Sequence, residues 1–248
     1  MIKNIVCLFT FTLLVAVLQA QTQFIQQGRV EFEQKINQHT PLEDDADNIW
    51  NAERMKVIPK FVTDVFELRF NLNKSVYKLA KEKPDNKYMM WGAKPNGTDH
   101  SMRDVQTGVV SVQKEVFENT YIIRDSVRNL EWKISDETRD IAGFECRKAV
   151  TKICDSVYVV AFYTDQIPVS TGPESFGGLP GMILGLAIPR LYTTWFATKL
   201  ELIEPSTAQL NPTQKGKNVT RTQLEAELKK GMKNWGKEGA RRMWIAQL

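Results

Sequence analysis

Short stretches of alternating polar and apolar residues, separated by turn-forming residues, recur along the middle of this 248-residue chain. They predict strands at Ser101–Gln106, Val109–Val116, Thr120–Asp125, Leu130–Ile134, Phe144–Thr151 and Val157–Thr164. Strands that follow one another about every ten residues, with no helix between them, are typical of an antiparallel meander. The spacing argues against a doubly wound fold, whose parallel strands need a crossover helix between them.

The flanking regions continue this pattern and add a helix toward each end. Further strands are predicted at Gly28–Ile36, Val65–Phe70, Ser75–Ala80, Ile183–Ala187 and Tyr192–Leu202. Residues 47–60, with Asp47 as the cap, predict one helix, and Thr222–Trp244 predict a C-terminal helix. We therefore expect a mainly β fold with flanking helices (α+β). A curved antiparallel sheet or half-barrel would form a single domain over residues 21–248.

The first 20 residues have the order of a secretory signal peptide. Lys3 gives the start a positive charge, an apolar run without charges extends from Ile5 to Val17, and Ala20 places a small residue before Gln21. The run is shorter than the about 20 apolar residues that a spanning helix needs. We expect cleavage near Ala20, no transmembrane span in the mature protein, and a location in the periplasm or cell envelope.

The charge balance gives no argument for nucleic-acid binding. The 33 Lys and Arg residues become 32 once Lys3 is removed, against 29 Asp and Glu residues. Such a balance does not produce the positive field that attracts a polyanion. Basic residues gather only near the C-terminus, at Lys229, Lys230, Lys233, Lys237, Arg241 and Arg242. This cluster predicts either contact with an anionic surface or an envelope protein partner, or a solvated helix face near the negative end of the helix dipole.

The densest feature is the glycine-rich segment Gly172–Leu186. It lacks the Lys and Ser or Thr of a phosphate loop, and it contains neither G-x-G-x-x-G nor G-x-S-x-G. Glycines allow tight turns, so a structural role is expected for Gly172, Pro173, Gly178 and Gly181. Two hypotheses remain open for the apolar residues. Either they contact a ligand, or the segment is a folded-over corner that plugs the open end of the curved sheet. These residues are Phe176, Leu179, Pro180 and Met182.

The same segment resembles the signature of the GLPGLI family. The resemblance is carried by Tyr163–Ser170, Gly172-Pro173, Phe176 and Gly178–Leu184, preceded by Trp132–Ile134 and Ile141–Ala149. Met182 stands where Leu is usual, a change that conserves volume. The family consists of exported Bacteroidota proteins of unknown function. The resemblance therefore implies an exported, β-rich protein and assigns no catalytic residue.

Residues suited to catalysis, metal binding or redox chemistry are sparse. The two histidines, His39 and His100, do not have a metal-binding spacing, so we predict no metal and no cofactor. Ser175 is the best candidate nucleophile, but one of the only two histidines would have to act as its base, and no catalytic residue is predicted. Cys146 and Cys154 remain after removal of the signal. A disulfide between them and two separate thiols are both open interpretations.

These features support three functions, in descending order. The first is a non-catalytic binding or accessory protein for a hydrophobic small molecule or lipid, because inward-facing aromatic residues and an apolar loop would enclose a concave sheet. The second is a structural protein that docks to an outer-membrane complex through the basic helix. The third is a hydrolase that uses Ser175.

Overall fold

The computed structural model describes residues 24–44, 48–83, 86–87, 94–154 and 156–248. The predicted signal peptide and Asp47 lie outside these residues. The described strands are, in chain order, β1 (Gly28–Asn37), β2 (Phe61–Phe70), β3 (Lys74–Lys81), β4 (His100–Asp104), β5 (Val109–Val116), β6 (Asn119–Ser126), β7 (Lys133–Ile141), β8 (Phe144–Ile153), β9 (Val157–Thr164), β10 (Met182–Ile188), β11 (Thr193–Glu201) and β12 (Lys217–Val219).

Helices are few and short beside this amount of strand. The described ones are α2 (Thr40–Glu43), α3 (Trp50–Val57), α4 (Thr207–Leu210), α5 (Arg221–Gly231), α6 (Gly236–Ala246) and the 3-10 turns η1 (Pro173–Ser175) and η2 (Pro189–Leu191). Thr220 caps α5, because its side chain accepts from the backbone of Gln223 while the Gln223 side chain accepts from the backbone of Thr220. No helix in the described part of the chain is long and apolar enough to cross a membrane.

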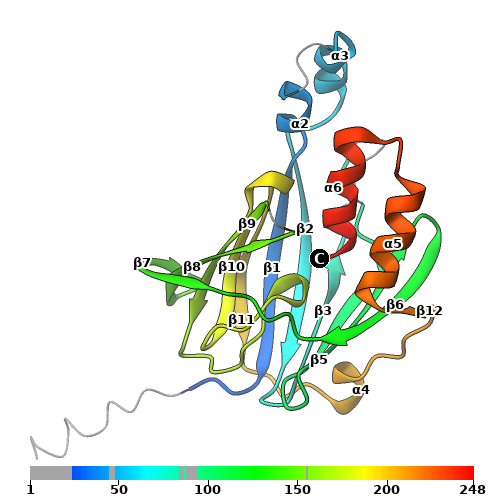
Figure 1. Ribbon diagram of the computed structural model, residues 1–248. Coiled ribbons are helices and arrows are strands. Elements are labelled where there is room, and N and C mark those ends of the chain that lie inside the picture. The colour runs from blue at the N-terminus through cyan, green and yellow to red at the C-terminus, as the bar shows by residue number, and fades with distance from the viewer. Residues whose placement is uncertain (1–23, 45–47, 84–85, 88–93, 155) are drawn as a thin grey trace, which may run out of the picture.

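The described strands form one open sheet in the order β12-β6-β5-β4-β3-β2-β1-β11-β10-β9-β8-β7. The short β12 runs parallel to β6, whereas the other neighbouring pairs are antiparallel. Strand β1 lies between β2 and β11 and so joins the two meanders, β2–β6 and β7–β11, into one sheet. Figure 1 shows this sheet bent around its middle, with α5 and α6 beside β3 to β6. The mainly β, antiparallel fold with a C-terminal helical region is confirmed.

Alternation along β1 decides which face of the sheet is buried. Val30 and Phe32 have no exposed surface and belong to the main apolar cluster. Arg29, which directly precedes Val30, points to the other face and binds the carboxylates of Glu67 and Glu201 at 2.6 and 2.8 Å. Since successive side chains of a strand point to opposite faces, one face is apolar and enclosed and the other carries ion pairs.

Two apolar clusters cover the enclosed face, which we call the concave face. The larger joins β1–β3 to β7–β11 and includes much of the glycine-rich segment. In the smaller, Leu224 and Leu228 of α5 pack on Val110 and Val112 of β5. Complete burial of one such leucine contributes about 2 kcal/mol. This packing holds the C-terminal helices against the sheet and leaves a space between them and β3 to β5.

Register shifts help to bend the sheet. They occur between Glu31 and Phe32 in β1, between Val65 and Phe66 in β2, between Ile134 and Thr138 in β7, and between Ile183 and Gly185 in β10. An extra residue on one strand of a pair bends that strand and increases its twist. The spacing of polar and apolar residues along the sequence does not show where these shifts fall.

Three predicted elements differ from the structure. The strand expected at Leu130–Ile134 is wrong, because β7 begins at Lys133 and Trp132 instead donates its indole N–H to the carbonyl of Gly177 at 3.0 Å. The single helix expected over Thr222–Trp244 is two helices, which meet at Gly231–Gly236, where Gly236 has φ +54°. The first helix is shorter than residues 47–60, and Pro59 explains why it ends early.

Candidate ligand-binding site

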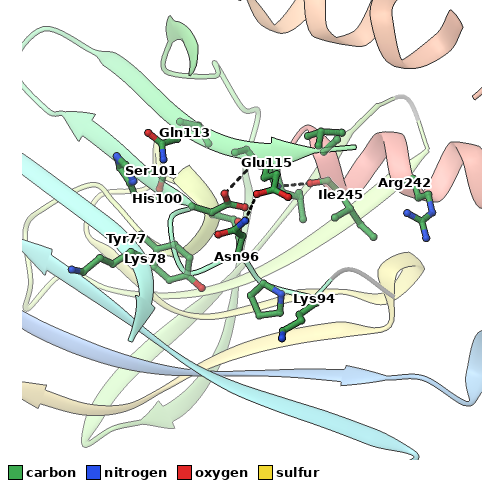
Figure 2. Close-up of a pocket in the computed structure, with 18 of the residues that line it drawn as sticks. Tyr77, Lys78, Lys94, Asn96, His100, Ser101, Gln113, Glu115, Arg242 and Ile245 are labelled. Atoms are coloured by element: carbon green, nitrogen blue, oxygen red, sulfur yellow. Dashed lines mark hydrogen bonds between the residues drawn. The ribbon is translucent and has the colours of Figure 1, made fainter. Parts of the chain in front are cut away.

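A cavity of about 390 Å³ lies on the concave face, between the strands and the C-terminal helices. Figure 2 shows Tyr77 and Glu115 on the strand side of this cavity and Ile245 and Arg242 on α6 at the other side. Glu174, in the glycine-rich segment, supplies a further part of the lining. Three parts of the chain that are far apart in sequence therefore meet here.

Aromatic and aliphatic side chains form the apolar wall of the cavity. The rings of Phe66 and Tyr77 stack with centroids 5.1 Å apart and planes 4° from parallel. Leu228 and Met232 face them from the end of α5, together with Ile245 from α6. A rigid stacked pair opposite flexible aliphatic chains can hold an apolar group of variable shape.

Three charged side chains face the interior of the cavity, and we call them the floor cluster: Asp99, Lys114 and Glu174. The Lys114 ammonium donates to the carbonyl oxygen of Ile245 at 2.6 Å. The carboxylate of Asp99 accepts from the backbone N–H of Glu115 at 2.9 Å. Within the described residues, neither Asp99 nor Glu174 comes within the 4.0 Å of a direct ion pair with Lys114. The ammonium of Lys114 and the two carboxylates therefore line the same cavity without forming a direct ion pair.

Burial changes the protonation of the floor cluster. Burial raises the pKa of Asp99 to about 6, although the hydrogen bond from the Glu115 backbone opposes the change. Burial likewise raises the pKa of Glu174, with Lys114 opposing it, and lowers the pKa of Lys114, with Glu174 opposing it. Each charge is therefore less stable than it would be in water, as expected where desolvation is not offset by close pairing.

Strained backbone places Glu174 at the cavity. Glu174 has φ 50° and ψ 37°, and Ser175 has φ 63°, so two consecutive non-glycine residues adopt the left-handed conformation. Hydrogen bonds hold the turn: the hydroxyls of Ser75 and Thr171 lie 2.7 Å apart, and the Ser175 hydroxyl donates to the carbonyl of Leu248 at 3.3 Å. Strain of this kind persists only where the surrounding structure enforces it.

Close approach explains why glycines surround Glu174. A Cβ on Gly177 would lie 2.0 Å from Nη1 of Arg103 and 2.8 Å from the carbonyl of Ser170. A Cβ on Gly181, where φ is +153°, would lie 2.0 Å from the carbonyl of Thr164. The glycine-rich segment can therefore fold flat into the concave face, and it carries Glu174 with it.

Buried polar atoms beside the floor cluster lack hydrogen bonds. Tyr77 is 4% exposed and Trp195 is 1% exposed, and both lie next to Glu174. The Trp195 indole N–H is close enough to the Tyr77 hydroxyl and to the Glu174 carboxylate to interact with both. Within the described residues, however, neither the indole N–H nor the Tyr77 hydroxyl makes a hydrogen bond of normal geometry, and neither does Nε2 of His100. Buried polar groups in native proteins are almost always satisfied by protein, water or a ligand.

The outer part of the cavity lining is polar and partly exposed. The side chain of Asn96 donates to the carboxylate of Glu115, as the dashed line in Figure 2 shows. Phe117 is 45% exposed and contacts Trp235 edge-on, with centroids 5.6 Å apart. The cavity thus passes from an exposed polar side to a buried charged floor.

The four residues predicted to contact a ligand do not line this cavity. Phe176, Leu179 and Met182 are at most 2% exposed and pack in the main cluster, whereas Pro180 is exposed. Contact of these four residues with a ligand, and their alternative role as a corner that plugs the open end of the sheet, both stay predictions. The glycines and Pro173 lie in the connection between β9 and β10.

The sequence contains signals for the floor cluster that the prediction missed. Glu174 is the one charged residue in the apolar segment 172–186. Lys114 occupies the same face of β5 as Val110, Val112 and Val116, so it interrupts an apolar register. A charge placed where the pattern demands an apolar residue is a candidate functional residue.

The other predicted site residues are separate from the cavity. Cys146 is buried in β8 and Cys154 is exposed, and no disulfide joins them in the structure. The thiol of Cys154 instead donates to the side-chain carbonyl of Gln247 at 3.3 Å. The Ser175 hydroxyl donates a hydrogen bond to the backbone carbonyl of Leu248. The part of the chain that the structure describes contains no group of three His, Cys, Asp or Glu side chains that could hold a metal.

The basic residues near the C-terminus make different kinds of contact and do not form one cluster. Lys229 pairs with Glu225 at 2.6 Å. The guanidinium of Arg241 lies 5.4 Å from the ring of Tyr192, and Arg242 lines the cavity. Contact with an envelope partner through this segment stays a prediction.

A family model described as "Protein of unknown function (Porph_ging)" matches residues 151–185. The matched segment runs from the end of β8 through the glycine-rich turn into β10. It includes Glu174 and most of the quoted signature, and it confirms the resemblance to the GLPGLI family. No curated protein sequence matches the chain.

Two solved structures of PNGF-II, in space groups P21 and C2, have TM-scores of 0.53 and 0.54 against this chain, at 17% and 16% identity. The matches cover 78% and 81% of this chain and 32% of each PNGF-II chain, so this chain corresponds to about a third of PNGF-II. At this identity the likeness concerns the fold alone. A chain of the Pseudomonas aeruginosa MucA/MucB complex matches with a TM-score of 0.36 and 10% identity over 77% of this chain and 57% of that chain, which supports no argument.

Proposed function

We propose that this chain, which carries the GLPGLI signature, is an exported binding protein whose concave cavity holds a small amphipathic ligand in the periplasm or cell envelope. The cavity itself carries the proposal. Its volume of about 390 Å³ falls in the range of about 300–1,000 Å³ that is typical of small-molecule sites. It also combines an apolar wall with a few converging polar groups, as such sites do.

The floor cluster supports binding over a purely structural role. A structural core gains nothing from charges that are desolvated and separated from one another. Together with the unsatisfied hydroxyl of Tyr77, they can select and orient a polar group on the ligand. Export is supported by the predicted signal peptide at residues 1–20.

Native mass spectrometry of the protein purified from its own cell envelope tests this proposal. We expect a bound molecule that survives transfer to the gas phase and is lost when the cavity is filled. Val116→Trp fills it, because Val116 is half-buried and lines the cavity. Val109→Trp is the matched control, since Val109 is in the same strand and 43% exposed.

Two outcomes contradict the proposal. One is a ligand-free mass for the native protein together with no uptake from an envelope lipid and metabolite extract. The other is equal ligand retention by the Val116→Trp and Val109→Trp proteins, provided that both unfold at the temperature of the native protein. If the bound molecule is chemically converted during incubation, the protein is an enzyme and the proposed binding function is wrong.

A further inference from the structure

We infer that the cavity selects a ligand with a zwitterionic head group and an apolar tail. The ammonium of the head group lies against Glu174 and Asp99, and its anionic group lies against Lys114. This inference rests on the proposed binding function and names the chemical class of the ligand. Two sources offer this chemistry: an apolar α-amino acid and a zwitterionic lysophospholipid.

The arrangement of charge is the first observation. Lys114 interacts electrostatically with both Glu174 and Asp99, yet neither carboxylate is within direct ion-pair distance of its ammonium. One donor of the Lys114 ammonium is used by the Ile245 carbonyl at 2.6 Å, which leaves two others. A ligand group with charges of both signs can pair with the lysine and with the carboxylates at the same time. A ligand with a single charge would be repelled either by the lysine or by the carboxylates.

The hydroxyl of Tyr77 is the second observation, because its contact with Trp195 falls short of a hydrogen bond of normal geometry. Tyr77 is 4% exposed, lines the cavity, and its hydroxyl has no hydrogen bond of normal geometry within the described residues. A hydroxyl both donates and accepts, so it can bind either end of a zwitterion. Glu174 lies next to this hydroxyl, which places an unused polar atom beside the carboxylate that would hold the ammonium.

The wall fixes where the tail lies. The stacked rings of Phe66 and Tyr77 and the side chains of Leu228 and Met232 line the same cavity as the floor cluster. A tail that leaves the head group meets these residues. The ring of Tyr77 therefore contacts the tail while its hydroxyl contacts the head group.

A matched series of probes separates the two charges. L-Phenylalanine carries both charges, phenethylamine only the ammonium, 3-phenylpropionate only the carboxylate, and 3-phenylpropanol neither, while all share an aromatic tail. Lysophosphatidylethanolamine presents both charges on a lipid. Dissociation constants for each are measured by titration calorimetry at pH 7.5 with protein expressed from the full chain and purified from the envelope.

We expect one of the two zwitterionic ligands, the amino acid or the lysophospholipid, to bind more tightly than its singly charged analogues. Binding of phenylalanine at least tenfold tighter than phenethylamine and 3-phenylpropionate supports the inference with an amino acid as the source. Binding of lysophosphatidylethanolamine at least tenfold tighter than lysophosphatidic acid, which lacks the ammonium, supports it with a lipid as the source. A charged hydrogen bond corresponds to about a ten- to hundredfold change in affinity.

Single substitutions then assign each charge. Glu174→Gln should weaken phenylalanine and phenethylamine about tenfold or more and leave 3-phenylpropionate unchanged or tighter. Lys114→Met should do the opposite, weakening phenylalanine and 3-phenylpropionate and sparing phenethylamine. Glu204→Gln is the control, because Glu204 is an exposed carboxylate that does not line the cavity. Circular dichroism melting confirms that each variant is folded.

Failure of the inference differs from failure of the proposed function. If 3-phenylpropanol or either singly charged probe binds as tightly as the zwitterion, and Val116→Trp removes that binding, the head-group inference is wrong and the cavity is still a binding site. If no probe binds and the native protein carries no ligand, both are wrong.

Discussion

Two polar clusters lie on opposite faces of the same sheet and differ in how their charges are arranged. On the outer face, Arg29 binds Glu67 at 2.6 Å and Glu201 at 2.8 Å, and Glu67 also accepts from Arg69 at 3.0 Å. On the concave face, the charges of the floor cluster do not touch one another. The outer cluster is complete within the protein, whereas the floor cluster leaves its charges directed at a cavity.

The pKa directions of the two clusters are opposite. Burial alone would raise the pKa of Glu67, but hydrogen bonds from Arg69 and Arg29 outweigh it and lower that pKa. In the floor cluster burial prevails and raises the pKa of Asp99 and of Glu174. The paired charges of the outer cluster therefore stabilise the fold. The separated charges of the floor cluster destabilise it, and such an arrangement is retained where it serves a function.

The largest expected effect follows from breaking the outer cluster. Glu67→Gln removes the charge that Arg29 and Arg69 share, in a residue that is 5% exposed. We expect a loss of about 2 kcal/mol in the free energy of unfolding, since the substitution takes the paired carboxylate from the partly buried Arg69 and leaves Arg29 only its more exposed partners, Glu201 and Glu31. Equilibrium urea unfolding at pH 7 measures it. Unchanged stability would mean that the outer cluster has no structural role.

An intermediate effect, of opposite sign, is expected for Asp99→Asn. Because the folded pKa of Asp99 is about 6, above its ordinary 3.8, the folded state holds a proton between about pH 4 and 6 that the unfolded state has lost. Stability from this residue is present below pH 4 and falls as the pH rises through 6. Allowing for partial exposure, Asp99→Asn should be about 1–2 kcal/mol more stable than the native protein at pH 7.

The pH dependence provides the control for this prediction. At pH 4 Asp99→Asn and the native protein should unfold at similar urea concentrations, because the native carboxyl is then protonated in the folded state. Glu67 acts in the other direction, since its lowered pKa gives stability above its unfolded pKa that is lost as the pH falls. A stability difference that does not change between pH 4 and pH 7 would contradict the assignment.

The smallest effect is expected at the edge of the outer cluster. The Lys199 ammonium lies 2.7 Å from Glu201, but its side chain is 62% exposed. Lys199→Met should change the free energy of unfolding by less than about 0.5 kcal/mol, because an exposed pair is screened by water and salt. A loss as large as that of Glu67→Gln would show that pairing, and not burial, governs the outer cluster.

Much of the fold could be predicted because its signals are local. The strands Val109–Val116 and Val157–Thr164 were predicted with their observed bounds, since alternation and flanking turns both mark them. The predictions failed where distant contacts intervene. Trp132 leaves the strand pattern to reach the Gly177 carbonyl, and the C-terminal helix breaks between Gly231 and Gly236.

The candidate site was harder to predict because none of its contacts is local. Four strands separate Glu174 from Lys114 in the sequence. The two residues line one cavity only because the turn that carries Glu174 packs against β3 and β4. The sequence led us to predict ligand contact for the apolar residues of the glycine-rich segment, whereas Phe176 and Leu179 are buried in the core. The charged residue among them, Glu174, is the one that reaches the cavity.

The sequence by itself determined where the strands lie, which face of each is apolar, and the glycine signature with its family resemblance. These depend on side-chain alternation and backbone freedom within a few residues. Only the tertiary structure decided how the sheet bends, that the two meanders meet at β1, and that Lys114, Glu174 and Asp99 face one cavity. Such features arise from bulges and long-range packing, whose energies depend on residues that are distant in the chain.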